Sequence, residues 1–155
     1  MFLGEHRHVL DEKGRLTIPA RFREELGSPF ILTRGLDGSL FAYPLGAWRT
    51  LERRLRSLPF TRKEVRAFTR LLFAGAVEVE PDRQGRINIP PNLAAYAGLT
   101  KNVVVVGVSA RVEIWDEARW EAYVAEGEAK YTDLAESLID LDLDEGWEDS
   151  GADIP

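Results

Sequence analysis

The chain has 155 residues, no cysteine and a formal net charge of −6, and 45% of its residues are hydrophobic. Without cysteine it can form neither disulfides nor thiolate metal sites. No run approaches the ~20 apolar residues of a membrane span, and the first residues lack the apolar segment of a secretion signal. We therefore expect a globular protein of the cytoplasm.

The net charge hides an asymmetry between the two halves of the chain. Residues 1–75 hold 14 Lys and Arg against 8 Asp and Glu, a balance of +6, whereas residues 76–155 have a balance of −12. Much of the excess acid lies after residue 126. A basic first half can belong to a nucleic-acid-binding protein with an acidic tail. It can equally be a solvated charge gradient without a partner, so charge alone leaves both interpretations open.

Hydrophobic patterning predicts alternating short strands and helices in the first half. The expected strands are residues 8–10, 15–18, 30–33 and 40–43, bounded by turn residues. The expected helices are residues 19–26, 45–58 and 61–73. Pro19 suits the first turn of a helix because a proline there loses no helical hydrogen bond. Thr61 and Glu64 have the spacing of a capping box at the start of the third helix.

The second half follows a similar plan. The expected strands are residues 78–80, 86–89, 103–108 and 112–115, and the expected helices are residues 91–96, 117–126 and 130–139. Asp116 is expected to cap the helix that follows it. From residue 144 to 155 the chain is acidic with few apolar residues, a composition typical of disorder.

A nine-residue pattern occurs twice, and it explains the similar plans of the two halves. Residues 11–19 are Asp-Glu-Lys-Gly-Arg-Leu-Thr-Ile-Pro and residues 82–90 are Asp-Arg-Gln-Gly-Arg-Ile-Asn-Ile-Pro. An internal repeat of this kind indicates two copies of one small module. A module of about 70 residues is marginally stable alone, so we expect both copies to share one core.

Each copy of the pattern presents an Asp-x-x-Gly-Arg turn. The guanidinium groups of Arg15 and Arg86 are planar forks that fit phosphate or the O6 and N7 acceptors of guanine. Lys13 and Arg83 lie in the same turns and could hold phosphates. The aspartates could orient the arginines. The alternative is a structural Asp–Arg link that closes a hairpin and binds nothing, and the residues alone do not decide between the two.

Further residues carry a resemblance to a known family. With the duplicated pattern, the set comprises Met1–Gly4, Tyr43–Leu45, Arg70–Phe73, Ala97–Leu99 and Glu113–Asp116. The duplicated Asp-x-x-x-Arg pattern resembles the AbrB-type swapped-hairpin DNA-binding fold. The complete layout over residues 1–143 is similar to the MraZ family of bacterial transcriptional regulators.

The resemblance implies a fold and a function. The fold is α+β, with two tandem AbrB-like swapped-hairpin modules that form one pseudo-twofold, barrel-like core with peripheral helices. The function is repression of an operon for cell division and wall synthesis by a ring-shaped homo-oligomer at the nucleoid. Its partner is double-stranded DNA with short G-rich direct repeats. The resemblance implies no enzyme activity, cofactor or metal.

The resemblance also implies which residues contact DNA. The contact positions fall on Arg15 and Arg86, with Lys13 as support. In the second copy the position of Lys13 is occupied by Gln84, and we expect Arg83, one residue earlier, to compensate. The motif residues that support the turns are Asp11, Gly14, Asp82 and Gly85.

The expected organisation is a first repeat over residues 1–75, a second over 76–143 and an acidic tail over 144–155. His6 and His8 share one face of an extended segment but have no third ligand nearby, so two surface histidines are expected rather than a metal site. The runner-up function is a ring that binds another protein and whose Asp–Arg turns are only structural.

Overall fold

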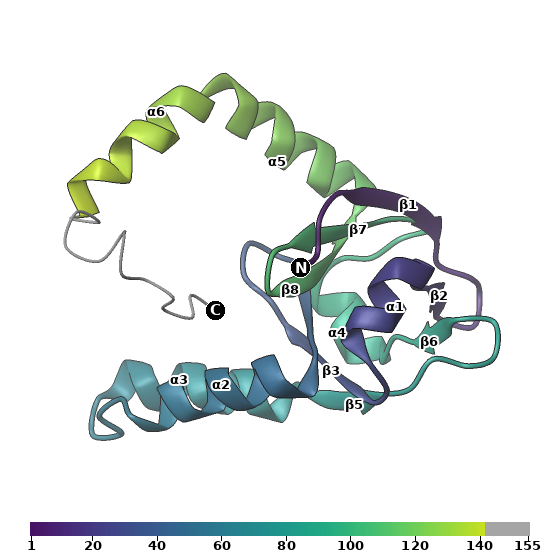
Figure 1. Cartoon of the computed structure of the whole chain (residues 1–155), viewed down its shortest axis with the longest axis horizontal. Coiled ribbons are helices and arrows are strands. Elements are labelled where there is room, and N and C mark those ends of the chain that lie inside the picture. The colour runs from purple at the N-terminus through teal and green to yellow at the C-terminus, as the bar shows by residue number, and fades with distance from the viewer. Residues whose placement is uncertain (142–155) are drawn as a thin grey trace. The chain divides into compact units, whose positions relative to one another are not determined.

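The computed structural model describes residues 1–141 and confirms an α+β protein. The described chain forms a six-stranded antiparallel sheet, a separate two-stranded ribbon and six α-helices (Figure 1). It divides into a compact unit, Met1–Glu117, and a helical unit that begins at Ala118. The predicted acidic tail, residues 144–155, lies outside the described residues.

The eight strands belong to the first unit. They are β1 (Glu5–Val9), β2 (Arg15–Thr17), β3 (Phe30–Arg34), β4 (Leu40–Tyr43), β5 (Val77–Val79), β6 (Arg86–Asn88), β7 (Asn102–Val108) and β8 (Arg111–Asp116).

The helices correspond to the predicted ones with shifted ends. They are α1 (Ala20–Leu26), α2 (Leu45–Arg56), α3 (Lys63–Ala74), α4 (Pro91–Tyr96), α5 (Glu117–Ala129) and α6 (Tyr131–Ser137), with a 3₁₀ turn at Ile139–Leu141. Both α1 and α4 begin directly after a proline, whose fixed φ suits a helix start.

The large sheet joins the two repeats symmetrically. Its strand order is β1-β7-β8-β4-β3-β5. Strands β1, β3 and β4 of the first repeat correspond to β5, β7 and β8 of the second, so the order is the same from either edge after this exchange. The same exchange relates the two outer pairings: β1 of the first repeat pairs with β7 of the second, and β5 of the second repeat pairs with β3 of the first. One sheet therefore contains strands from both repeats.

The strand–turn–strand pattern of the sequence predicts that the two strands flanking each turn pair as a hairpin, and this prediction is wrong. Strand β1 pairs with β7 rather than with β2. Strand β2 pairs instead with β6, in the register Arg15↔Asn88, Leu16↔Ile87 and Thr17↔Arg86. A strand of three residues carries too little periodicity to indicate its partner. Each turn is consequently closed by its own side chains, and the strands that leave the two turns hold each other.

The main core lies between the large sheet and the ribbon. The ribbon contributes Leu16 and Ile87, and helices α1 and α4 contribute Phe22 and Leu93; all four are almost fully buried. The strands β3 and β4 face this core with alternate residues, as expected for side chains that alternate across a sheet. The core therefore fixes the ribbon and both turns to the body of the unit.

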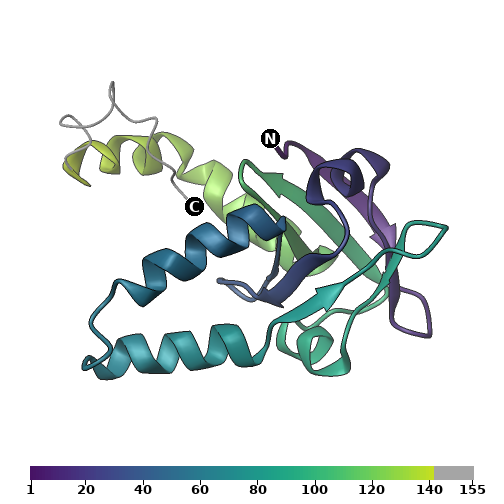
Figure 2. The same ribbon diagram turned by 60° about the horizontal axis from the view of Figure 1, so that its bottom comes forward.

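The other face of β3 and β4 is covered by α2 and α3. Ile31, Phe41 and Tyr43 point to this face and pack with Trp48 of α2 and Leu72 of α3. Figure 2 shows the two helices running side by side as a helical hairpin away from the sheet. Only the part of the helical hairpin near the sheet can share this second cluster, so its outer part leaves apolar side chains exposed.

One prediction about α3 needs correction. The helix begins after Arg62 without a side-chain cap, so Thr61 and Glu64 do not form the expected capping box. The side chain of Arg66 instead donates to the backbone carbonyls of Phe60 and Thr61, at 3.1 and 2.9 Å. These bonds connect the α2–α3 loop to the first turns of α3.

Asp116, the residue expected to cap α5, makes hydrogen bonds across the fold at the end of β8. Its carboxylate accepts hydrogen bonds from the backbone N–H and hydroxyl of Thr100, which joins the end of β8 to the loop before β7. In the second unit, the rings of Trp120 and Tyr123 stack at 6.3 Å along α5. Among residues 1–141, no helix is long and apolar enough to cross a membrane.

Candidate nucleic-acid interface

The first turn is organised by the carboxylate of Asp11. One carboxylate oxygen, Oδ1, accepts from the backbone N–H groups of Lys13 and Arg15, at 2.9 and 2.8 Å. The other, Oδ2, accepts from the side-chain Nε of Arg15 at 2.8 Å. Backbone bonds between Asp11 and Arg15 and between Gly14 and Asp11 complete the turn. One carboxylate therefore closes the turn and holds the guanidinium.

The second turn repeats this geometry. Asp82 accepts from the backbone N–H groups of Gln84 and Arg86 and from the Nε of Arg86, each at 2.9 Å. The exposed fractions of the two arginine side chains are also matched, at 29% for Arg15 and 28% for Arg86. In both turns the Nε is used, whereas the two Nη groups donate to no acceptor in the described part of the chain. The outer edge of each fork is therefore available to a ligand.

The turn contacts lower the pKa of both aspartates. For Asp11 the largest cause is the hydrogen bond from the backbone N–H of Arg15, which favours the charged form and outweighs the opposing effect of desolvation. The Arg15 side chain and the Lys13 backbone contribute further. Asp82 has the same causes from Arg86 and Gln84. Both carboxylates are thus ionised at neutral pH, as a charged acceptor for arginine requires.

The ribbon brings the two turns together. Because Leu16 and Ile87 point into the core, the alternation along each strand places Arg15 and Arg86 on the opposite, outer face. The two arginines are diagonal neighbours in the register, a relation that places Cβ atoms roughly 7–8 Å apart. Figures 1 and 2 show both turns projecting from the same end of the unit.

Two further bonds cross between the repeats. The backbone N–H of Ile18 donates to the carbonyl of Gly85 at 2.9 Å, and the N–H of Ile89 donates to the carbonyl of Gly14 at 2.8 Å. The glycines have φ values of 77° and 80°, which side-chain-bearing residues rarely adopt. Each turn is therefore clamped by the strand that leaves the other turn.

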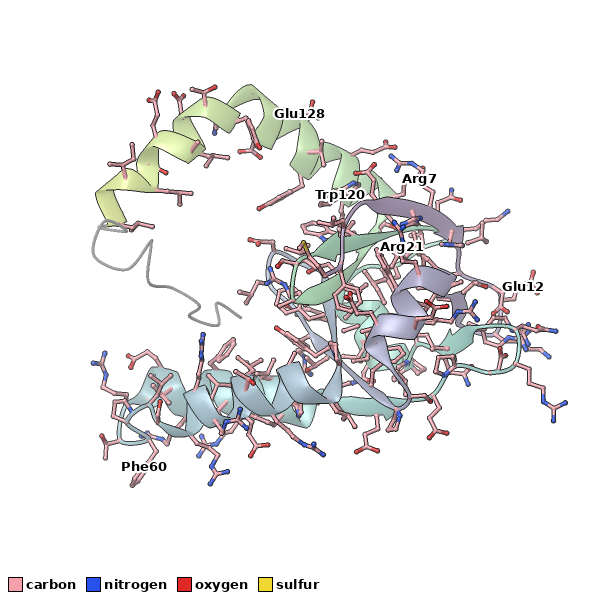
Figure 3. The ribbon with its side chains drawn as sticks, in the orientation of Figure 1. Arg7, Glu12, Arg21, Phe60, Trp120 and Glu128 are labelled. Atoms are coloured by element: carbon pink, nitrogen blue, oxygen red, sulfur yellow. The ribbon has the colours of Figure 1, made fainter. Side chains whose placement is uncertain are left out.

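The remaining predicted residues lie at the rims of the turns. Lys13 and Arg83 are exposed, and neither makes an ion pair with any described residue. Figure 3 labels Glu12 at the outer edge of the first turn; it occupies the position of Arg83 in the second. The structure thus places all eight predicted residues at two adjacent turns, with unequal charge at their rims.

One neighbour of the second turn was not singled out from the sequence. Arg23 of α1 lies so close to Gly85 that a Cβ there would meet its guanidinium at 1.9 Å. The Nε of Arg23 is buried without a hydrogen-bond partner. A signal did exist: at the 71-residue offset, Arg23 is matched by Ala94, so the repeat is asymmetric at this position.

No group of three or more potential metal ligands occurs among the described residues. His6 and His8 lie on one face of β1 and are half-buried. His6 packs edge-on against Phe22, with ring centroids 5.0 Å apart. The pKa of His8 is lowered, first by burial and then by the nearby His6. A histidine used for packing in this way differs from the expected surface histidine.

Comparison with known proteins provides independent information. The family model described as "MraZ protein, putative antitoxin-like" matches the chain twice, at residues 1–71 and 72–142. A protein of Pelotomaculum thermopropionicum named "Transcriptional regulator MraZ" is 59% identical over 143 residues, 92% of this chain and 99% of the relative.

Two other relatives carry the same name. The protein of Moorella thermoacetica is 59% identical and that of Ligilactobacillus salivarius is 54% identical; each match spans 143 residues, 92% of this chain and the whole of the relative. The similarity therefore extends over both turns and the sheet that supports them.

Proposed function

The chain belongs to the MraZ family, and from this premise we propose that it is a DNA-binding transcriptional regulator. Its two Asp–Arg turns would be the parts that contact duplex DNA. The observation that carries this proposal is the pair of guanidinium groups on the outer face of one short ribbon. Each is held through Nε and keeps both Nη groups available.

The geometry suits the major groove. That groove admits a two-stranded ribbon, and the O6 and N7 atoms of guanine accept two parallel bonds from an arginine. An arginine already fixed by a carboxylate has less side-chain entropy to lose on binding. Lys13 and Arg83, at the rims, would then contact phosphates, which position the protein without specifying sequence.

The proposal includes finer features that the family resemblance implies. The ribbon and the exchanged pairing of β1 and β7 support an AbrB-like swapped-hairpin arrangement around a pseudo-twofold axis and a barrel-like core. The regulator would act as a ring-shaped homo-oligomer on short G-rich direct repeats. It would repress an operon for cell division and wall synthesis, in the cytoplasm at the nucleoid. Such a protein acts by occupying its operator and needs no catalytic residue.

A second function remains a competitor for a specific reason. The Asp–Arg links are complete without a ligand, and α3 leaves Phe68 and Leu71 43% and 58% exposed. A ring that binds another protein through this helix, with purely structural turns, fits these two facts. For such a protein, replacing the turn arginines would not change the affinity for duplex DNA.

The deciding experiment compares Arg15→Ala and Arg86→Ala with the parent chain. The probe is a duplex from the promoter region of the chain's own gene, beside a scrambled duplex of equal length. Loss of one bidentate guanine contact should cost about 1–3 kcal/mol per engaged site, and the scrambled duplex should lose much less. Unfolding curves and light scattering should match the parent. Unchanged affinity in both correctly assembled variants would support the protein-binding alternative.

A further inference from the structure

The two turns of the chain are covered differently. Gly85 is buried, and the guanidinium of Arg23 lies against it: a Cβ built on Gly85 would meet Nη1, Cζ and Nε at 1.9, 2.4 and 2.9 Å. A Cβ built on Gly14 would meet only the carbonyl oxygen of Ile89, at 3.5 Å. Helix α1 of the first repeat therefore places a cation on the turn of the second repeat.

The reverse placement does not exist. At the 71-residue offset, the position of Arg23 in α4 is occupied by Ala94, which packs against the main core. The first turn consequently has Lys13 and Arg15 as its cations. The second has Arg83 and Arg86, with Arg23 beside them.

The guanidinium of Arg23 has no hydrogen-bond acceptor among the described residues. Its side chain makes no hydrogen bond or ion pair with the described residues, and its Nε is buried without a partner. Burying part of a charged group without a partner is unfavourable. Structural arginines are usually paired, so an unpaired one beside a candidate DNA-contacting turn suggests that its acceptor comes from outside the chain.

We propose that Arg23 is a phosphate-binding residue of the second turn, so that the two turns of one chain contact DNA with unequal sets of cations. The proposal rests on the proposed DNA-binding function. The ligand is a phosphodiester group of the backbone beside the base pair that Arg86 contacts, because an arginine fork can donate two parallel hydrogen bonds to the oxygens of a phosphate. The second turn thereby makes a stronger electrostatic contact than the first.

The surroundings of Arg23 leave room for such a ligand. An open hollow of about 310 Å³ adjoins it, lined also by Ala20, Glu24, Gly27 and Pro81. Glu24 is exposed, so solvent and salt screen its carboxylate. Pro81 immediately precedes Asp82, so the hollow borders the second turn directly.

The test measures the salt dependence of DNA binding by full-length Arg23→Ala. The probes are a duplex of tandem G-rich repeats and an A·T-rich duplex of equal length. Arg21→Ala is the matched control: it removes the same charge from the same helix at an exposed position, labelled in Figure 3. Arg23→Lys keeps the charge but not the fork. Unfolding curves and light scattering check that all three variants fold and assemble like the parent.

Arg23→Ala should bind both duplexes more weakly by a similar factor, since a phosphate contact carries no sequence information. Loss of one contact lowers the salt slope by about 0.9, so the parent's advantage should shrink about 3–4-fold per engaged chain between 50 and 200 mM salt. Arg21→Ala should change the salt slope less than Arg23→Ala does. Arg23→Lys should keep a salt slope close to that of the parent.

Two results would overturn the proposal. One is an Arg23→Ala variant that binds like the parent at every salt concentration. The other is a loss of affinity with an unchanged salt slope, which would mean that Arg23 only supports the turn. If the parent itself binds neither duplex, the proposed DNA-binding function is wrong. If the parent binds DNA and either of these two results is found, only the role proposed for Arg23 is wrong.

Discussion

At the scale of single residues, the carboxylates of Asp11 and Asp82 decide what the turns can do. Each accepts two backbone N–H groups and one arginine Nε. The same charge therefore shapes the backbone and aims the side chain. An arginine without this anchor would sample several rotamers and would lose more entropy on binding.

The first prediction concerns the charge of Asp82. In Asp82→Asn the amide oxygen can still accept the backbone bonds of the turn, but the amide nitrogen that replaces Oδ2 cannot accept the hydrogen bond from the Nε of Arg86. DNA affinity should fall, though less than in Arg86→Ala, and the unfolding free energy at neutral pH should be somewhat lower than that of the parent, because the stabilising carboxylate is absent. Fluorescence titration of a labelled duplex measures the affinity. Asp37→Asn, at an exposed loop aspartate, is the control.

The pH dependence follows from the lowered pKa of Asp82. A carboxylate whose pKa is lower in the folded than in the unfolded state stabilises the fold above the unfolded value, about 3.9. This contribution is lost as the pH falls through the lower, folded value. The parent should therefore lose more unfolding free energy than Asp82→Asn as the pH falls below about 4. Equal slopes in the two proteins would contradict the role given to the carboxylate.

At the scale of elements, the sequence predicted the turns but not their partners. The Asp-x-x-Gly-Arg pattern is local: it requires one carboxylate and one glycine within five residues, and both turns form as expected. Pairing between β2 and β6 joins segments about 70 residues apart, and three residues per strand contain no signal for that choice. The position of Arg23 on Gly85 was missed for the same reason, because it depends on where α1 packs.

The second prediction compares alanine at the two turn glycines. Gly14→Ala should cost about 1–2 kcal/mol of unfolding free energy, the usual cost of a left-handed backbone conformation for a residue with a Cβ. Gly85→Ala has the same cost and also forces the flexible end of the Arg23 side chain to move, which should add about 0.5–1.5 kcal/mol, the cost of a strained rotamer. Chemical denaturation of the two variants measures the difference.

A double variant identifies the source of that extra cost. Combining Gly85→Ala with Arg23→Ala removes the contact, so the cost at Gly85 should return toward that of Gly14→Ala. Additive effects of the two substitutions would show that Arg23 does not press on the turn, since independent sites are expected to add.

At the scale of the whole molecule, the α2–α3 helical hairpin has apolar side chains that neither core cluster buries. Helical periodicity predicts an exposed apolar face made of Leu51, Leu55, Leu58, Leu71 and Leu72. Leu72 is instead 5% exposed and packs in the second cluster, and Leu51 and Leu55 pack against that cluster. Leu58 and Leu71 are exposed as expected, and so are Phe60 and Phe68. Helical periodicity indicates that a face is apolar, but it does not indicate which part of the face the sheet will cover.

The distribution of charge on this hairpin bears on its role. Residues 45–74 contain eight Lys and Arg and two Asp and Glu. A hollow of about 350 Å³ between the helices is lined by apolar residues together with Arg56, Arg66 and Arg70. Figure 3 shows Phe60 at the tip of the hairpin. An apolar surface with a basic border is typical of an interaction site.

The third prediction is that this surface holds copies of the chain together in the absence of DNA. Phe68→Gln combined with Leu71→Gln removes two exposed apolar side chains without changing the net charge, and glutamine is a good helix former. Light scattering at micromolar concentration should report a smaller species than the parent. Circular dichroism should be unchanged. Glu64→Gln, on the same helix, should assemble like the parent.

The same variant connects assembly to DNA binding. One chain offers two turns, and each turn contributes only a few kcal/mol, so tight binding requires several chains held on adjacent repeats. Linked sites gain affinity from their effective concentration without any new contact. The dissociated variant should therefore bind tandem repeats much more weakly than the parent, but a single repeat almost as well. If it dissociates and still binds tandem repeats like the parent, binding does not depend on this assembly. If it assembles like the parent, the interface between copies lies elsewhere.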